Sequence, residues 1–218
     1  FGKKPFFYTL RNGTFLFASE LSAILEHPAA AASVSRRSLK KYFAYGYIPA
    51  PNTLYEGIHK LPGGHSLRFD VASQRIEIHK YWDFVIEPFE SVPANAEQEW
   101  GERLVELLSA AVKRRLMGDV PLGFFLSGGI DSSSVVALAT RHIDRSRIHT
   151  FSIGFEEASF DESRYSAEMA QHLGTHHHLD VLSLEKAAAL LPDIAAKLDE
   201  PMGDASLLPT YLLCKHTR

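Results

Sequence analysis

Cysteine is almost absent from this chain of 218 residues, in which Cys214 is the only one. A single cysteine excludes an internal disulfide framework and any zinc site built from several cysteines. Cys214 lies within an apolar pattern of helical spacing, which predicts a packing role rather than nucleophilic catalysis. The chemistry of the chain is therefore expected from other residue types.

Long apolar runs and a strong charge of either sign are also missing. No apolar stretch approaches the roughly 20 residues that cross a bilayer, and the first residues do not resemble a signal peptide. The formal net charge is only −3, so electrostatics gives no reason to expect a nucleic-acid partner. The one tight basic cluster, between Arg36 and Lys41, is typical of a solvated helix face. We expect a cytoplasmic protein that binds neither membrane nor nucleic acid.

The most informative segment is Ser127-Gly128-Gly129-Ile130-Asp131-Ser132-Ser133. An apolar run over 120–126 predicts a buried strand before it, and the apolar residues from Val135 onward predict a helix after it. In a strand, loop and helix arrangement, backbone N–H groups and the helix N-terminus converge on one space that suits a polyphosphate. A Gly/Ser run can also be a linker, and Asp131 or Ser132 could serve as a helix N-cap.

The loop lacks the lysine that a Walker loop places after its glycines to reach the outer phosphates. Its Ser-Gly-Gly-x-Asp-Ser order resembles instead the PP-loop of the ATP pyrophosphatases. That resemblance implies cleavage of ATP to AMP and pyrophosphate during adenylation of a carboxylate or similar oxygen, with the loop holding the pyrophosphate.

The first part of the chain is expected to be rich in β-structure. Strands are predicted over 6–10 and 14–18, joined by an Asn12-Gly13 turn, and over 66–70 and 75–81. Short helices are predicted after Ser19 and from Ser38 to Gly46. An irregular stretch rich in proline, acidic and small residues, 87–95, predicts an interdomain linker.

Beyond this linker, strands and helices alternate. A helix is predicted over 96–116, with an apolar face that includes Trp100, Leu104 and Val112, and further helices over 163–173 and 207–215. Strands are predicted to end near Leu126, Ile153 and Leu182, and such alternation predicts a parallel sheet. Because ligands of such sheets bind at the carboxyl ends of strands, Ser127 and Gly154 mark the expected site.

With these residues in view, the whole chain resembles the glutamine-dependent asparagine synthetase family. The resemblance rests on several motifs in the family's order: residues 1–5, 17–20, 46–53, 60–65 and 81–83, the loop, and residues 151–155 and 199–201. It implies an α/β fold in which a parallel-sheet PP-loop domain follows a partial α+β N-terminal-nucleophile amidotransferase domain. The expected parts are 1–86 for the rear of the amidotransferase domain, 87–95 for the linker and 96–218 for the front of the synthetase domain.

The resemblance also implies a reaction. ATP, with Mg²⁺, adenylates the side-chain carboxylate of aspartate, and ammonia from glutamine then gives asparagine, AMP and pyrophosphate. Relatives of the family amidate other carboxylates, such as sugar acids or secondary metabolites, so the acceptor stays open. A non-catalytic nucleotide-binding regulator is the alternative from another class. The expected partners are thus small molecules, and the oligomeric state is not predicted.

The same resemblance assigns the nucleotide-binding residues. Those expected at ATP and its pyrophosphate are Phe125, Leu126, Ser127, Gly128, Gly129, Asp131, Ser132, Ser133, Ile153 and Gly154. Asp131 is the expected Mg²⁺ ligand, directly or through water. Gly154 could let the adenine approach the backbone or could simply form a turn.

Three further groups have two interpretations each. Asp161 and Glu162 either border the site or supply charge at a helix start. Asp199 and Glu200 either lie near the synthetase site or cap a helix. The histidines over 176–178, with His172, could suggest zinc, but Gly174 interrupts the helical i, i+4 face, so a strand start is favoured.

Departures from the family limit what the chain can do alone. The family's glutaminase uses an N-terminal cysteine, whereas residue 1 is Phe, and the adenylate-stabilising lysine and a second Ser-Gly-x-Gly-x-Asp-Glu loop are expected beyond Arg218. The ends lack start and stop signals, so we expect a fragment without a complete catalytic set and with weak nucleotide binding at most.

Overall fold

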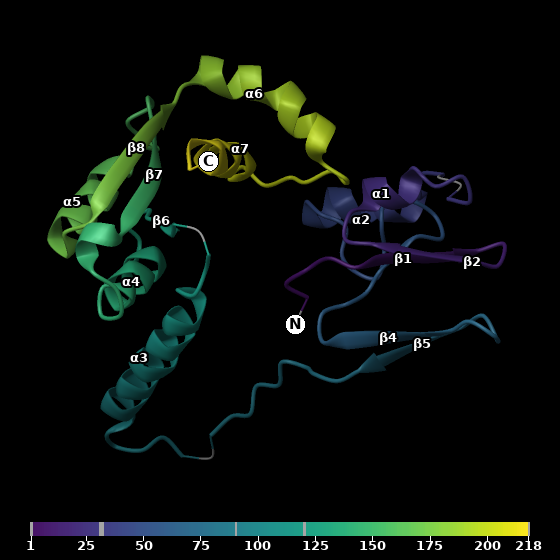
Figure 1. The fold of residues 1–218 in the computed structure, drawn as a ribbon, viewed down its shortest axis with the longest axis horizontal. Helices are drawn as coiled ribbons and strands as arrows, with labels where there is room; N and C mark the ends of the chain where they lie inside the picture. Colours follow the sequence, from purple (N-terminus) through teal and green to yellow (C-terminus); the bar gives the residue numbers. More distant parts are fainter. Residues whose placement is uncertain (1, 31–32, 90, 120, 218) are drawn as a thin grey trace. The chain divides into compact units, whose positions relative to one another are not determined.

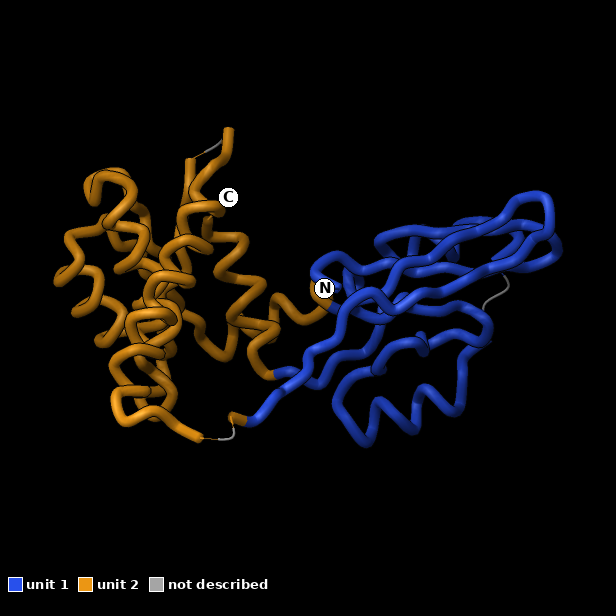
Figure 2. Tube along the Cα trace, turned by 90° about the horizontal axis from the view of Figure 1, so that it is seen from below, with its two compact units in different colours: residues 1–88, 195–204 blue, residues 89–194, 205–218 orange. Residues whose placement is uncertain are grey.

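The computed structural model describes residues 2–30, 33–89, 91–119 and 121–217. These residues form two compact units: unit 1 contains Phe1–Pro88 and Ala195–Asp204, and unit 2 contains Phe89–Ile194 and Ala205–Arg218 (Figure 2). The chain therefore leaves unit 2 after Ile194 and returns to it after Asp204. Phe1 of the N-terminal motif, Glu90 of the expected linker and Val120 before the loop lie outside the described residues.

Unit 1 is built on a three-stranded antiparallel sheet of order β2-β1-β3. Strands β1 (Phe7–Arg11) and β2 (Thr14–Ala18) form the expected hairpin. Its turn residues Asn12 and Gly13 have φ values of 48° and 74°, as a tight hairpin turn of this kind requires. The short strand β3 (His59–Lys60) pairs with the other edge of β1.

Two helices and a β-ribbon complete unit 1. Helix α2 (Arg36–Tyr45) begins two residues before the expected Ser38, because the Ser35 side chain caps it, and Gly46 ends it in the left-handed conformation. Helix α1 (Leu21–Leu25) has no cap from the preceding Glu20 side chain. Strands β4 (His65–Asp70) and β5 (Arg75–Lys80) pair antiparallel as predicted.

Unit 2 contains a parallel sheet of order β6-β7-β8, which confirms the predicted α/β class (Figure 1). Its strands are β6 (Gly123–Phe125), β7 (His149–Phe155) and β8 (His176–Leu182). Helix α4 (Ile130–Ala139) follows β6, and α5 (Ser163–Leu173) follows β7. Helices α6 (Leu184–Lys197) and α7 (Leu207–His216) follow β8, and a 3-10 turn (Arg145–Arg147) precedes β7.

Each face of the parallel sheet has its own hydrophobic core. The core beside α4 and α5 includes Leu126, Val136 and Ile148, all at most 1% exposed. The core on the α6 and α7 side includes Leu190 and Leu212. Helices therefore cover both faces, which leaves the end of the sheet as the open place for a ligand.

Two features of unit 2 differ from expectation. In helix α3 (Ala96–Arg115), Val112 packs against the core, but Trp100 and Leu104 are exposed, so the expected apolar face is buried only toward the C-terminal end. The sequence patterns do not predict helix α6, which contains Pro192, a residue that normally interrupts a helix. Within the described residues, none of the helices has both the length and the apolarity needed to cross a membrane.

Candidate nucleotide-binding site

The loop after β6 has the strand, loop and helix geometry predicted for a phosphate cradle. Leu126 N donates to Phe151 O at 2.9 Å, which holds the end of β6 beside β7. Gly128 has a φ of +82°, a conformation that side chains rarely adopt, and Gly129 is the N-cap of α4 without a side-chain cap. The amides of the first turn of α4 are therefore not satisfied by a cap side chain and can serve an anion.

Two hydroxyl groups organise the inside of this loop. The Ser132 Oγ accepts a hydrogen bond from Ser127 N at 3.2 Å and shares another with Ser127 Oγ at 2.9 Å. Ser127 Oγ also accepts from Gly129 N at 3.3 Å. Both serines thus belong to the loop's own hydrogen-bond network, and this network helps to fix the shape of the loop.

Gly128 lies directly against the first turns of α5. A Cβ atom built there would be 2.6 Å from the Tyr165 carbonyl carbon and 2.7 Å from Ser166 N, distances that no relaxed structure tolerates. The predicted glycine is therefore required for the close approach of loop and helix as well as for its positive φ.

A cavity of about 270 Å³ opens beside the loop at the carboxyl ends of β6 and β7. Five of the predicted nucleotide-binding residues line it: Phe125, Leu126, Ser127, Ser132 and Ile153. The other lining residues are Phe151, Ser152, Phe155, Phe160, Glu162, Ser163, Ser166, Pro209, Thr210 and Leu213. Most of its walls are apolar or aromatic, and several hydroxyl groups are added by the serines, which suits a heterocyclic base next to a polar phosphate region.

The other predicted residues of the loop do not line this cavity. Gly128 and Gly129 form the loop backbone, and Asp131 is exposed in the first turn of α4. Ser133 is 7% exposed, and its hydroxyl has no hydrogen-bond partner among the described residues. An unpartnered buried hydroxyl is costly, so Ser133 is a group that a ligand could satisfy.

Gly154 lies inside β7, and the space beside it is already filled. A Cβ there would be 3.0 Å from Asp161 Oδ1 and 3.2 Å from Ser163 Cβ. The turn interpretation is wrong, because the strand continues through Gly154 to Phe155. Gly154 is not among the residues that line the cavity, so its approach to the adenine stays a prediction.

Asp161 connects the end of β7 to the start of α5. Its carboxylate accepts hydrogen bonds from Phe155 N at 3.1 Å, Ser163 N at 3.2 Å and Ser163 Oγ at 2.8 Å. The Ser163 side chain first, and then the two backbone N–H groups, hold the pKa of Asp161 below its usual range. Of the two carboxylates expected at this helix start, Glu162 lines the cavity and Asp161 has a structural role.

A polar network joins β7, β8 and α5 beside the cavity. His177 contacts Thr150 Oγ1 with Nδ1 at 3.0 Å and Ser152 Oγ with Nε2 at 3.1 Å. Ser166 Oγ donates to Ser163 O at 2.8 Å and lies 3.1 Å from Ser152 Oγ. Burial, and secondarily the charge of His178, lowers the pKa of His177, so this ring is neutral at pH 7.

Asp199 and Glu200 do not line the cavity; they belong to unit 1, and their carboxylates contact other residues of that unit. Asp199 accepts from the N–H groups of Leu21 and Ser22 at 2.6 and 3.0 Å, so it caps α1, the helix that its own sequence leaves uncapped. Glu200 accepts from Leu54 N at 2.6 Å and pairs with Lys60. The capping interpretation therefore describes Asp199, although the helix it caps is far away in the sequence.

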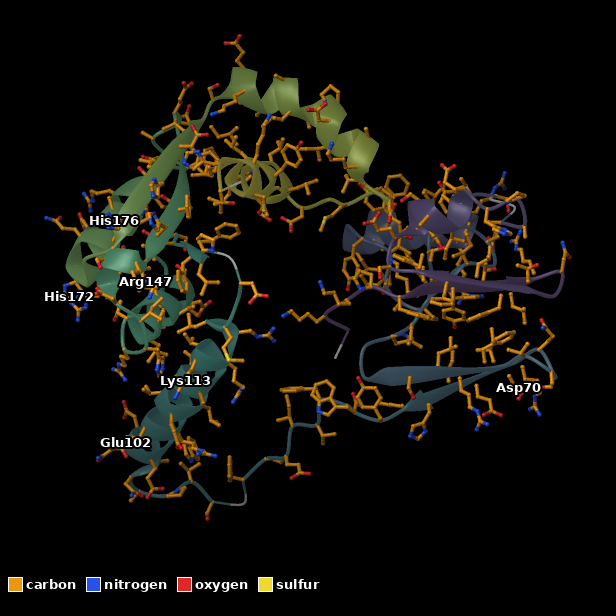
Figure 3. The ribbon with its side chains drawn as sticks, viewed as in Figure 1. Asp70, Glu102, Lys113, Arg147, His172 and His176 are labelled. Carbon is orange, nitrogen blue, oxygen red and sulfur yellow. The ribbon has the colours of Figure 1, made fainter. Side chains whose placement is uncertain are left out.

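The histidines and Cys214 do not form a metal site among the described residues. His176–His178 begin strand β8 as favoured, whereas His172 lies on α5 (Figure 3). No cluster of three or more metal-ligating side chains occurs in the described part of the chain. Cys214 is exposed, whereas Leu212 on the same helix is buried, so the predicted packing role of Cys214 is wrong.

Several lining residues are not identified by the loop motif. Ser163 and Ser166 lie in the first turns of α5, and the sequence patterns predict the start of this helix correctly. Serines near the start of a helix that follows a parallel strand could therefore have been predicted as lining residues. Pro209, Thr210 and Leu213 come from α7, and nothing local in the sequence tells which face of the sheet that helix covers.

Comparison with known families agrees with this geometry. The asparagine synthase family matches residues 103–218, which include the loop and most of the parallel-sheet unit. The chain belongs to the asparagine synthase family. A glutamine amidotransferase domain family matches residues 1–82, which lie in unit 1. The chain therefore combines a parallel-sheet synthase region with an amidotransferase region, in agreement with the sequence motifs.

Individual relatives are longer than this chain. A Methanocaldococcus jannaschii protein with the provisional name of a glutamine-hydrolyzing asparagine synthetase is 35% identical over 219 residues, covering 100% of this chain and 42% of the relative. The Bacillus subtilis asparagine synthetase (glutamine-hydrolyzing) 3 is 34% identical over 231 residues, covering 95% of this chain and 36% of the relative. The chain thus spans well under half the length of these curated relatives.

A solved structure gives a weaker likeness. A glutamine-dependent NAD⁺ synthetase from Acinetobacter baumannii, in complex with ADP, is 20% identical with a TM-score of 0.37. The match covers 75% of this chain and 29% of that chain. At this score the likeness carries no weight for fold or function.

Proposed function

We propose that this chain carries the ATP-binding part of a glutamine-hydrolysing asparagine synthetase. The observation that supports this most is the cavity beside the Ser127–Ser133 loop, in a chain of the asparagine synthase family. The loop would hold the β- and γ-phosphates, and the apolar walls near Phe125 and Ile153 would take the adenine. In our proposal, residues 1–86 are the amidotransferase part, 87–95 the linker and 96–218 the synthetase part.

The reaction proposed for the intact protein needs negative charge to be stabilised as pyrophosphate leaves. The aspartate side-chain carboxylate attacks the α-phosphorus of ATP, pyrophosphate departs, and ammonia then displaces AMP from the acyl carbon. The uncapped amides at the start of α4 are fixed donors of the kind that stabilise such charge. The unpartnered Ser133 hydroxyl is a further donor near the same helix start.

The donor set also fits Mg²⁺. Mg²⁺ prefers one or two carboxylates together with waters and substrate phosphates. Asp131 offers one exposed carboxylate in the first turn of α4, next to the loop that would hold those phosphates. When bound, the ion would neutralise phosphate charge, and Asp131 would hold it directly or through water.

Calorimetric titration of the 218-residue chain with Mg²⁺-ATP tests the binding step. We expect weak saturable binding that the Gly128→Ala variant loses, because a Cβ at this position collides with α5. Glutamine hydrolysis by the chain alone is not expected, since its single cysteine, Cys214, lies in α7. Absence of saturable binding at millimolar ATP, or measurable glutamine hydrolysis, would contradict the proposal.

The acceptor requires the intact protein. Pyrophosphate release would be measured with ATP, glutamine and a panel of aspartate, sugar acids and other carboxylic acids. Release that depends on aspartate supports the proposal. Release that depends on a different carboxylate shows another amidotransferase of the same family, and no release with any acceptor favours a nucleotide-binding regulator.

A further inference from the structure

Two serines at the start of α5 use their hydroxyl protons within the protein. Ser163 Oγ donates to Asp161 Oδ2 at 2.8 Å, and Ser166 Oγ donates to the Ser163 carbonyl oxygen at 2.8 Å. Both serines line the cavity. A hydroxyl group has one proton and two lone pairs, so a serine that already donates to the protein can only accept a hydrogen bond from a ligand.

His177 brings Ser152, a third lining serine, into the same state. Ser152 Oγ lies 3.1 Å from His177 Nε2, and His177 Nδ1 lies 3.0 Å from Thr150 Oγ1. With the ring proton on Nδ1, the ring donates to Thr150 and accepts the Ser152 proton at Nε2. The other neighbour of Ser152 Oγ, Ser166 Oγ at 3.1 Å, is placed as a donor to it. Only this tautomer therefore gives the proton of Ser152, which is 5% exposed, an acceptor among the described residues.

Glu162 adds a carboxylate to the same side of the cavity. It is the N-cap residue of α5, but its side chain makes no capping hydrogen bond, and it lines the cavity. A carboxylate accepts hydrogen bonds and donates none. Ser152, Glu162, Ser163 and Ser166 therefore form a surface, which we call the acceptor wall, that offers oxygen lone pairs and no protons.

The Ser127–Ser133 loop has the opposite polarity. Gly129 begins α4 without a side-chain cap, so the first turn of that helix presents N–H donors. An anion fits beside these donors, whereas the acceptor wall repels an anion and fits a group that carries N–H donors. The lining residues also include Phe125, Phe151 and Ile153, whose apolar surface suits a flat heterocycle.

We infer that the acceptor wall is a specificity determinant of the cavity, which selects a nucleotide base with an exocyclic amino group, as in adenine, over a base without one. This inference rests on the proposed function, since it assigns the base of the nucleotide whose phosphates the loop would hold. An analogue without the amino group leaves the acceptors of the wall unpaired, which costs affinity. His177 is a positioning residue, because it keeps Ser152 an acceptor.

The test compares ATP with the triphosphate of purine riboside, which differs from ATP only in lacking the 6-amino group. Calorimetric titration of the 218-residue chain with the two Mg²⁺ complexes should show about tenfold weaker binding of the purine riboside triphosphate. In Ser152→Ala and in Glu162→Ala this ratio should fall toward one, through weaker ATP binding. The matched control is Ser146→Ala: Ser146 Oγ also donates to a carboxylate, that of Asp144 at 2.9 Å, but it does not line the cavity, so the ratio should not change.

His177→Ala tests the positioning role. Ser152 then loses the acceptor of its proton and can turn that proton toward the ligand, so the ratio should fall several-fold. The affinity for the purine riboside triphosphate should stay the same, because this nucleotide does not use the wall. Equal weakening of both nucleotides would show a structural role of His177 only.

Two results would overturn the inference and leave the proposed function standing: a ratio near one in the wild-type chain that still binds ATP, or an unchanged ratio in both Ser152→Ala and Glu162→Ala. Glu162 is exposed, so its variant remains informative if Ser152→Ala does not fold.

If the chain binds neither triphosphate, the proposed function fails, and the wall is tested with the nucleosides alone. Amide chemical shifts of β7 and α5 are then followed during titration with adenosine and with purine riboside. Saturable shifts with adenosine that need several-fold more purine riboside support the inference. Equal responses to the two nucleosides, or no response to either, overturn it.

Discussion

The backbone of Tyr165 occupies the space that a side chain at Gly128 would need: its carbonyl carbon lies 2.6 Å from the position that a Cβ atom at residue 128 would take. The loop and α5 can therefore approach only because residue 128 is glycine. This contact couples the shape of the Ser127–Ser133 loop to a helix whose Ser163 and Ser166 also line the cavity.

Gly128→Ala should lower the free energy of unfolding by about 1–3 kcal/mol, because it adds backbone strain at positive φ and forces α5 outward. It should also abolish ATP binding. Urea unfolding and calorimetry measure the two effects. Gly101→Ala is the matched control: Gly101 lies in α3 with open space around it, so this variant should gain about 0.5–1 kcal/mol. Unchanged stability and binding in Gly128→Ala would contradict the role given to the Tyr165 contact.

Ser133→Ala should change stability and binding in opposite directions. Its hydroxyl is buried without a partner among the described residues, so removing it should raise the free energy of unfolding by about 1 kcal/mol. If the hydroxyl donates to bound phosphate, ATP affinity should fall at the same time. Thermal unfolding with and without Mg²⁺-ATP measures both; equal ATP affinity in the variant and wild type would show that Ser133 is not a ligand group.

Asp161→Asn should lower the free energy of unfolding at pH 7. It should also remove part of the decrease in that free energy at acid pH. The folded-state pKa of Asp161 lies below its usual 3.8, so its contribution to stability is present above pH 3.8 and is lost as pH falls through the lower folded value. The difference in unfolding free energy between wild type and variant should therefore shrink below pH 3.8. Urea unfolding of wild type and variant over this range measures it, and a difference that stays constant below pH 3.8 would contradict the role given to the Asp161 hydrogen bonds.

His177→Gln should flatten the pH dependence of stability on the acid side of neutrality. Because burial lowers the folded-state pKa of His177 below 6.5, the unfolded chain binds the proton first, and the free energy of unfolding falls as pH drops below 6.5. The His177→Gln variant should not show this fall in the free energy of unfolding. Urea unfolding between about pH 7.5 and 5 compares the slopes, with the exposed His79→Gln as control. Parallel slopes in wild type and His177→Gln would rule out a buried neutral ring.

Local patterns in the sequence predict most of the elements. The Asn12-Gly13 turn, the Gly46 and Gly174 helix ends and the three parallel strands all follow from signals a few residues long. Helix α6 is not predictable in this way, since Pro192 argues against a helix interior, yet tertiary packing of Leu190 and Ile194 holds the helix together. Long-range packing thus overrides a local signal here.

The candidate site is predictable in its loop but not in its walls. Ser127 and Ser132 can be identified because the motif is contiguous. Thr210 and Leu213 cannot, because their position depends on which sheet face α7 covers. The cap that Asp199 forms is hidden for a similar reason: the N–H groups from which it accepts hydrogen bonds are 177 and 178 residues away in the sequence.

The Ser127 and Ser132 hydroxyls accept hydrogen bonds from loop amides that phosphate oxygens could also engage. These amides therefore already point toward neutral oxygen atoms supplied by the loop. Under the proposed function, the oxygens of a bound nucleotide would replace these neutral oxygens with charged ones, so binding would exchange the hydrogen-bond partners of amides that are already arranged.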